Sequence, residues 1–128
     1  MNKQYDLEAD LLKAVMTWID PQQPTGVVAL KIRDRYAIGY SDLFICVNGK
    51  LVLAELKTKT GKASVHQENF LKLMTKAGAI GGICRSVQDV ADLIDKARYC
   101  TCEHEHNTFD TYCYVCGKLI RKSTDNMP

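Results

Sequence analysis

Two acidic residues and a lysine in the middle of the chain have types and spacing that suit phosphodiester hydrolysis. Asn48-Gly49 stands between two apolar runs, and this dipeptide is typical of a two-residue hairpin turn, because both of its positions need a positive φ. Such a turn fixes the register of the hairpin and places Asp42 directly opposite Glu55. Like charges that face each other destabilise a sheet, whereas two converging carboxylates suit Mg²⁺ or Mn²⁺. The hairpin therefore predicts a divalent-metal site.

Lys57 follows Glu55 by two residues, so the alternation of side chains along a strand places both on the same face of the sheet. An ammonium group beside the metal can orient an attacking water or offset charge in the transition state. The alternative is structural: Asp42 caps the start of its strand, and Glu55 and Lys57 form an exposed rung. We favour metal-assisted hydrolysis, because the fixed register brings all three groups together.

The first element expected to support this site is a helix that begins at Glu8. Apolar residues recur there with the i, i+3, i+4, i+7 spacing of one helix face, and prolines end the pattern. Glu8 is the one acidic residue on that face, so it is either a first-turn glutamate favoured by the helix dipole or a carboxylate directed at the site. A strand over 27–33 is expected before the hairpin. The apolar face of the helix consists of Leu11, Leu12, Val15, Met16 and Ile19.

The second half of the chain adds a crossover to the hairpin. Ser64 and Gln67 form a capping box that begins a helix, and Ser86 and Asp89 form a second box for the last helix. Between these helices, the apolar segment 79–84 predicts a buried strand in a parallel or central position. The resulting α-β-β-β-α-β-α order predicts an α/β fold that combines an antiparallel hairpin with one helical crossover.

Basic residues flank the predicted site on both sides in the sequence. Lys59 and Lys62 follow the hairpin, and Lys31 and Arg33 lie on the segment before it. Most such charges form solvated surface, and the net charge of only +2 neither requires nor excludes nucleic acid. Beside a phosphate-cleaving site, however, these side chains would contact the DNA backbone without reading its sequence.

Four of the six cysteines crowd into residues 100–128. They form a Cys-x-Cys pair and a Cys-x₂-Cys-Gly motif, which resemble the two knuckles of a zinc ribbon. Four thiolates suit a structural Zn²⁺ site, and His104 or His106 could replace one of them. The alternative is a redox dithiol or a disulfide. The predicted zinc ligands are Cys100, Cys102, Cys113 and Cys116.

Composition and hydropathy exclude several classes of protein. With 128 residues, 46% hydrophobic and 25% charged, the chain has the composition of a globular domain rather than of a disordered or fibrous protein. The longest apolar run, 43–47, is far too short to span a membrane, and residues 1–10 show no secretory signal. We therefore expect a cytoplasmic protein with no membrane partner. Cys46 and Cys84 lie within apolar runs and are expected to be small buried residues.

Several short segments, taken together, match one known family. They are Gly39-Tyr40-Ser41-Asp42, Leu53-Ala54-Glu55-Leu56-Lys57, Thr60-Gly61-Lys62 and the helical Gln67. This pattern resembles the VRR-NUC family of the PD-(D/E)XK nuclease superfamily, and the likeness extends from Glu8 to Ile94. A proline usually precedes the aspartate in that family, whereas this chain has Ser41. The resemblance implies a restriction-endonuclease-like α-β-β-β-α-β core, in which helices flank a mixed sheet.

The resemblance also implies a nuclease domain over 1–99, followed by the zinc-binding extension. Its implied activity is Mg²⁺- or Mn²⁺-dependent hydrolysis of DNA, with flaps or junctions as the expected substrates. Small relatives are phage or bacterial proteins, which implies the cytoplasm of a bacterial or phage-infected cell, and the small surface favours a homodimer. The alternative is an inactive nucleic-acid-binding or protein-interaction factor on the same fold. The implied active-site residues are Glu8, Asp42, Glu55, Lys57 and Gln67.

Overall fold

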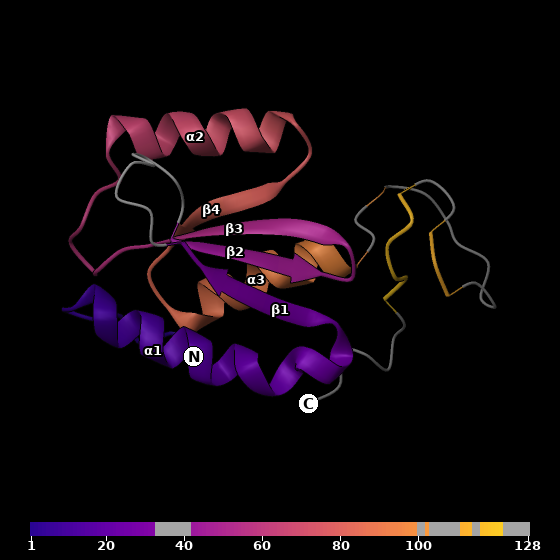
Figure 1. The fold of residues 1–128 in the computed structure, drawn as a ribbon, viewed down its shortest axis with the longest axis horizontal. Helices are drawn as coiled ribbons and strands as arrows, with labels where there is room; N and C mark the ends of the chain where they lie inside the picture. Colours follow the sequence, from indigo (N-terminus) through magenta and orange to yellow (C-terminus); the bar gives the residue numbers. More distant parts are fainter. Residues whose placement is uncertain (33–41, 100–101, 103–110, 114–115, 122–128) are drawn as a thin grey trace.

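The structure, a computed structural model, describes residues 1–32, 42–99, 102, 111–113 and 116–121, and within them the chain forms a four-stranded mixed sheet flanked by helices (Figure 1). The elements are α1 (Glu8–Ile19), η1 (Asp20–Thr25), β1 (Val27–Lys31), β2 (Leu43–Val47), β3 (Lys50–Leu56), α2 (Val65–Lys76), β4 (Ile80–Cys84) and α3 (Val87–Arg98). The strand order is β1-β2-β3-β4: the first three are antiparallel neighbours, and β4 runs parallel to β3 after the crossover through α2. The predicted α/β class and element order are confirmed.

The hairpin of β2 and β3 has the register expected from its turn. Val47 pairs with Lys50, and the Asn-Gly residues between them have positive φ values of 50° and 84°. The ladder ends at Leu43, and one further step in the same register brings Asp42 level with Glu55. The turn therefore determines which side chains meet at the opposite end of the hairpin.

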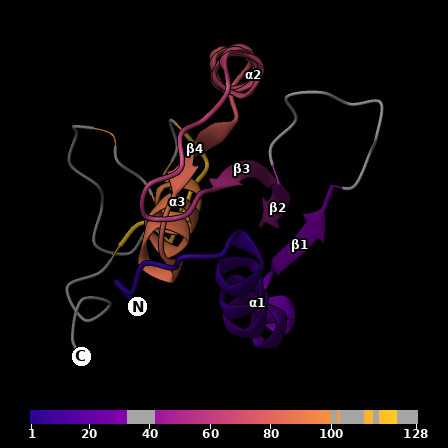
Figure 2. The same cartoon turned by 90° about the vertical axis from the view of Figure 1, so that its left-hand side faces the viewer.

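The hydrophobic core lies between one face of the sheet and the helices α1 and α3. Figure 2 shows these two helices on the same side of the sheet, with α2 away from them beside β4. The apolar face predicted for the first helix is the buried one, since Leu11, Val15 and Ile19 are fully enclosed. Val90 and Ile94 of α3 join the same core. Both helices therefore support the strands that carry the predicted site.

Among the described residues, α2 covers the opposite face of the sheet, and only in part. The ring of Phe70 in α2 stacks on that of Phe44 in β2, with centroids 6.2 Å apart. Toward β1 the same face is open, and Val28 and Leu30 are 49% and 63% exposed. Cys46 lies on this open face and is exposed, because alternation along β2 turns it away from the core. The prediction that Cys46 is buried is therefore wrong.

The strand β4 has one of the two placements predicted for it, but it is less buried than expected. It is parallel to β3, it is the last strand of the described sheet, and most of its residues are half-buried. Helices close over it from both faces: a Cβ at Gly81 would lie 3.1 Å from Leu71 of α2, and one at Gly82 would lie 3.6 Å from Leu93 of α3. Its apolar sequence therefore reflects two covering helices rather than a central place.

Both predicted helix starts are capped, but only the first has the complete box. The Gln67 N–H donates to the Ser64 hydroxyl over 3.1 Å, and the Ser64 N–H donates to Oε1 of Gln67 over 2.9 Å. At the start of α3, the Asp89 N–H donates to Oγ of Ser86 over 3.2 Å, as expected. The Asp89 carboxylate instead accepts the Arg85 N–H over 2.8 Å, so the reciprocal half of the second box is wrong.

The described part of the C-terminal extension packs beside the β2–β3 turn and the end of α3 (Figure 1). Leu119 forms bridges with Tyr99 and Tyr112, and its N–H donates to the Arg98 carbonyl over 2.9 Å. The Arg121 guanidinium lies 4.0 Å from the centre of the Tyr99 ring. Among the described residues, no helix is both long enough and apolar enough to cross a membrane.

Candidate functional site

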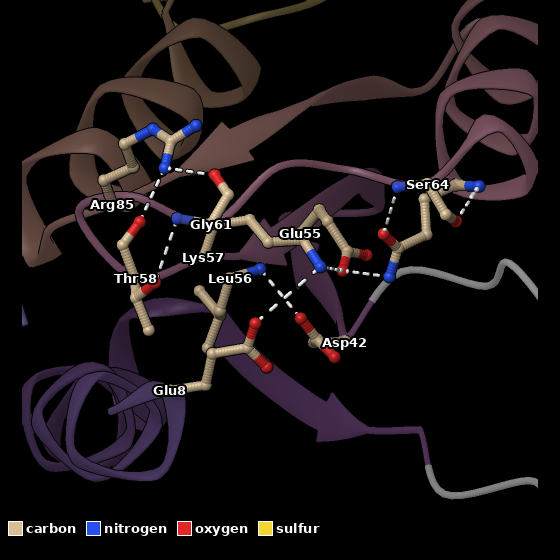
Figure 3. A network of polar contacts seen from close by, with 10 residues as sticks. Glu8, Asp42, Glu55, Leu56, Lys57, Thr58, Gly61, Ser64 and Arg85 are labelled. Carbon is tan, nitrogen blue, oxygen red and sulfur yellow. Dashed lines mark hydrogen bonds and ion pairs between the residues drawn. The ribbon is translucent and has the colours of Figure 1, made fainter. Parts of the chain in front are cut away.

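Glu55, near the C-terminal end of β3, lies at the centre of a network of polar contacts (Figure 3). Its side chain is 1% exposed. Nε2 of Gln67 donates to Oε1 of Glu55 over 2.6 Å, and Nζ of Lys57 lies 3.5 Å from the same oxygen. The other oxygen, Oε2, is buried and has no hydrogen-bond partner in the described part of the chain. Because an unsatisfied buried acceptor is unfavourable, this oxygen marks a place where a cation would be stabilised.

The protonation of Glu55 reflects the same surroundings. Burial, and after it the negative charge of the Asp42 carboxylate, together raise the pKa of Glu55 from 4.5 to about 8. The Lys57 ammonium lowers this pKa, but by less than the other two effects raise it. Glu55 therefore holds a proton at neutral pH until additional positive charge arrives beside the two carboxylates.

Asp42 lies just before β2 and is held by backbone groups of the neighbouring strands. Its Oδ2 accepts a hydrogen bond from the Leu56 N–H over 2.8 Å, and its carbonyl accepts one from the Ile32 N–H over 3.0 Å. These contacts keep the aspartate beside Glu55, on the side that the hairpin register predicts (Figure 3). The position of the carboxylate therefore follows from sheet geometry rather than from a bound ion.

Glu8 reaches the same site from the first turn of α1. Its Oε1 lies 3.7 Å from Nζ of Lys57, so the lysine bridges Glu8 and Glu55. Together with Asp42 and Lys31, Glu8 lines a cavity of about 190 Å³. Of the two interpretations of Glu8, the structure favours the carboxylate directed at the site, since this residue contacts the lysine that contacts Glu55.

Gln67 serves two structural purposes at once. Its Oε1 completes the capping box of α2, and its Nε2 holds Glu55. The start of the crossover helix is therefore tied to the buried glutamate of β3 by a single side chain. The five residues implied by the resemblance all lie in this one network, and their chemical roles stay predictions.

The cysteines of the extension form a second cluster. Among the described residues, Cys102, Cys113 and Cys116 are the group of possible metal ligands whose ligand atoms all lie within 4.8 Å of one another. The Gly117 N–H donates to the Cys113 carbonyl over 2.8 Å, and Gly117 has a φ of +74°, so the chain turns tightly after the second cysteine. The predicted fourth ligand, Cys100, lies outside the described residues, as do His104 and His106. These three thiols could hold a metal ion such as zinc.

Comparisons with known proteins agree with the fold. No family model matches the chain, and no curated protein matches it. A solved structure described as a "VRR_NUC domain" is similar, with a TM-score of 0.57 and 21% sequence identity, over 70% of this chain and 95% of that chain. The chain has the VRR_NUC fold. The resemblance seen in the sequence is therefore confirmed at the level of the fold.

Within this VRR_NUC fold, one supporting residue escaped the sequence analysis. Arg85 follows β4, and its Nη1 donates to the carbonyls of Thr58 and Gly61 over 2.5 and 2.7 Å (Figure 3). It therefore holds the loop that follows Lys57. The position of Arg85 in the sequence could have indicated this contact. Because β3 and β4 are parallel, the residues that follow both strands meet at the same edge of the sheet.

The predicted DNA-contacting residues occupy different positions in the VRR_NUC fold. Lys31 ends β1 and lines the cavity beside Glu8, whereas Lys62 is exposed. Nζ of Lys59 pairs with Asp6 over 2.9 Å on the surface. The strand β1 ends at Lys31, and Arg33 lies outside the described residues.

Cys84 sits at the end of β4 and is buried, as expected from its apolar surroundings. Burial raises the pKa of the Cys84 thiol to about 12, and the nearby Asp89 and Asp92 carboxylates raise it in the same direction. Because the thiolate is the reactive form of cysteine, Cys84 is not a nucleophile near neutral pH.

Proposed function

We propose that the chain is a divalent-metal-dependent nuclease that hydrolyses phosphodiester bonds in DNA. The observation that carries this proposal is the buried Glu55, whose Oε2 lacks a partner in the described part of the chain and which lies beside a second carboxylate, Asp42. Lys57 and Gln67 both contact Oε1 of Glu55, so neither of them satisfies Oε2. The nuclease-type fold adds independent support.

The donor set fits Mg²⁺ or Mn²⁺, because both ions prefer carboxylate oxygens. Asp42 and Glu55 would hold the ion, with Glu8 as a third carboxylate on the cavity wall. A bound divalent cation would supply a Lewis acid for the scissile phosphate and a more acidic water. Glu55 must lose its proton to act as a ligand, and its raised pKa means that this proton leaves as the metal arrives.

Lys57 would act on the reacting groups directly. It is 12% exposed and lies between two carboxylates, so its ammonium is held at the site without free rotation. From there it can donate a hydrogen bond to an attacking water or to a phosphate oxygen that gains charge. Gln67 would be a positioning residue, because it holds Oε1 of Glu55 and leaves Oε2 for the ion.

The DNA would be held mainly through its phosphates. Lys31 lies on the cavity wall and Lys62 is exposed after the hairpin; Lys59 would have to exchange its pairing with Asp6 for a phosphate. Arg33 completes the proposed set. The proposal extends to flaps or junctions as substrates, to a homodimer, and to the cytoplasm of a bacterial or phage-infected cell.

The proposal also includes a structural Zn²⁺ in the extension, with residues 1–99 as the nuclease domain and 100–128 as a metal-clamped tail. Its support is the close approach of three thiols around a tight turn at Gly117. Cys100 would be the fourth ligand. A closed set of four thiolates leaves no position for substrate, so this metal would stabilise the tail and take no part in hydrolysis.

Cleavage of plasmid, flap, four-way-junction and single-stranded DNA with Mg²⁺ or Mn²⁺ tests the proposed activity. We expect Asp42→Asn and Glu55→Gln to reduce cleavage by more than about 100-fold, the upper range for residues that only support a metal ligand. Asp10→Asn is the matched control, because Asp10 is an exposed acid on the same helix as Glu8. DNA binding without metal-dependent cleavage would instead support the inactive binding factor.

A further inference from the structure

A second cavity lies at the end of the sheet opposite the carboxylates. It has a volume of about 270 Å³ and is enclosed by the β2–β3 turn, the end of α3 and the extension. Three of the described side chains that line it are cationic, Lys50, Arg98 and Lys118, and none of its lining residues is acidic. Asn48 adds an amide from the turn. Cations that share one cavity repel each other, so this arrangement is unfavourable unless an anion joins it.

Arg98 supplies the most specific sign of a missing partner. Its Nη2 is buried and has no hydrogen-bond partner in the described part of the chain. A guanidinium is charged at every physiological pH, so Arg98 cannot avoid the energetic cost of an unpaired buried donor by losing a proton. Asp95, one turn earlier on α3, is paired with Arg121 over 3.6 Å instead. Among the described residues, the buried donor of Arg98 therefore lacks the acceptor that such a group normally has.

The other two cations are placed by backbone structure. Nζ of Lys118 donates to the Lys96 carbonyl over 3.0 Å, which holds this side chain against the end of α3. The Lys118 carbonyl accepts the Cys113 N–H over 2.8 Å, so the cysteine turn sets the position of Lys118. Lys50 begins β3 directly after the hairpin turn. Three separate segments of the chain thus bring positive charge to one cavity.

We infer that this cavity is a binding site for a phosphate group. The planar fork of Arg98 suits the tetrahedral oxygens of a phosphate, and two ammonium groups and an amide supply further donors around it. The phosphate can belong to a nucleic-acid backbone or to a free phosphate compound, since both present the same oxygens. The site is separate from Glu55 and Asp42 and does not depend on their proposed chemistry.

Titration calorimetry of the full chain, purified from zinc-supplemented medium, with inorganic phosphate at constant ionic strength tests the site. We expect one phosphate per chain, and Arg98→Met should weaken its affinity about tenfold or more, as expected for a lost hydrogen bond between charged groups. Lys118→Ala and Lys50→Ala should each weaken it severalfold, and Lys50 is exposed, so its replacement leaves folding intact. Lys72→Ala, an exposed lysine on α2, is the matched control.

Two results would overturn the inference: no phosphate binding by the unaltered chain, or the same affinity in all three variants. The source of the phosphate is tested with duplex DNA in Ca²⁺, which replaces Mg²⁺ and Mn²⁺. If the ligand is a backbone phosphate, Lys50→Ala should reduce the slope of log affinity against log salt by about 0.9. An unchanged slope with retained phosphate binding identifies a free phosphate compound. None of these measurements depends on cleavage, so failure of the nuclease proposal would not affect this result.

Discussion

The two ends of the sheet carry candidate metal ligands that are organised in different ways. The carboxylates are held by the protein itself: Asp42 accepts the Leu56 N–H, and Glu55 contacts Gln67 and Lys57. The cysteines sit on a tail whose described residues are joined to the core by isolated bridges, a few backbone hydrogen bonds and the side chains of Lys118 and Arg121. A hydrophobic core lies beneath the first site, whereas the described tail adds only Cys113 to the buried apolar residues.

This difference separates two uses of a metal ion. The carboxylates are held by hydrogen bonds and by the core beneath them, so we expect an ion there to serve chemistry rather than folding. The described part of the tail adds little to the core, so we expect an ion at the cysteine cluster to serve structure. Removing both metals should therefore abolish catalysis at one end of the sheet and order at the other.

The largest expected effect is loss of structure in the tail when zinc is removed. Structural zinc sites in small domains contribute on the order of 10 kcal/mol to folding. After treatment with a strong chelator, hydrogen exchange at the amides of Cys113, Gly117 and Leu119 should accelerate to near the unfolded rate, while amides of β2 and β3 stay protected. The bound metal would maintain the hydrogen bonds that these three amides donate to the carbonyls of Lys118, Cys113 and Arg98.

Two controls accompany this experiment. Cys46→Ala removes an exposed cysteine outside the cluster and should retain the metal, whereas Cys113→Ala should lose it. Protein from zinc-containing medium with less than about half an equivalent of zinc, or a tail that stays protected after chelation, would contradict the zinc site. A disulfide among these cysteines would contradict it as well.

The next effect in size is the loss of catalysis without loss of metal in Lys57→Met. The ammonium lies 3.5 Å from Glu55 and 3.7 Å from Glu8. At this place it would repel a bound metal ion but stabilise a reacting phosphate. We expect cleavage to fall by about 10² to 10³-fold, as for loss of a comparable transition-state donor. The Mn²⁺ affinity, measured by calorimetry, should stay equal or rise. Lys59→Met is the control, since Lys59 pairs with Asp6 on the surface; equal losses in both variants would argue against a specific role for Lys57.

The third effect concerns stability and pH at the carboxylate end. The pKa of Glu55 rises from 4.5 to about 8 on folding, so between these values the folded chain holds a proton that the unfolded chain has released. The free energy of unfolding should therefore fall as pH rises through this window, by up to about 1.4 kcal/mol per pH unit, and level off above it. Glu55→Gln removes this contribution and should gain stability relative to the unaltered chain toward pH 8.

Urea unfolding at several pH values without added divalent metal measures this difference. Glu68→Gln is the matched control, because Glu68 is an exposed acid on α2, and its curve should run parallel to that of the unaltered chain. If the curve of Glu55→Gln also runs parallel to that of the unaltered chain, the glutamate is ionised in the folded state. It then needs no metal ion to lose its proton.

Local features of the carboxylate end could be predicted from the sequence. The Asn-Gly turn requires positive φ at both positions, and this requirement alone sets which residues of β2 and β3 face each other. The Ser64–Gln67 capping box depends on residues only three positions apart. Each of these inferences involves one segment of chain and its backbone geometry.

Features that depend on packing between distant segments could not be predicted. Exposure of Cys46 results from where α2 stops covering the sheet, and the partial burial of β4 results from its place at the edge of the described sheet, between two helices that close over Gly81 and Gly82. The hydrogen bond between Gln67 and Glu55 joins two motifs that are separate in the sequence, the capping box of α2 and the hairpin. The cavity at Arg98 requires three segments at once, which no local pattern reveals.

The smallest effect isolates what Gln67 contributes to the organisation of the carboxylates. Gln67→Ala removes both the capping contact with Ser64 and the hydrogen bond to Glu55, whereas Ser64→Ala removes the hydroxyl that caps α2 and leaves the Glu55 contact in place. Both variants should lose about 1 kcal/mol of stability in urea unfolding, the usual cost of a lost cap. Only Gln67→Ala should also lower cleavage, by about 10- to 100-fold, because it frees the buried glutamate to rotate. If the two variants lose activity equally, Gln67 acts through the helix start alone, and the carboxylate end is less firmly organised by the protein than its hydrogen bonds indicate.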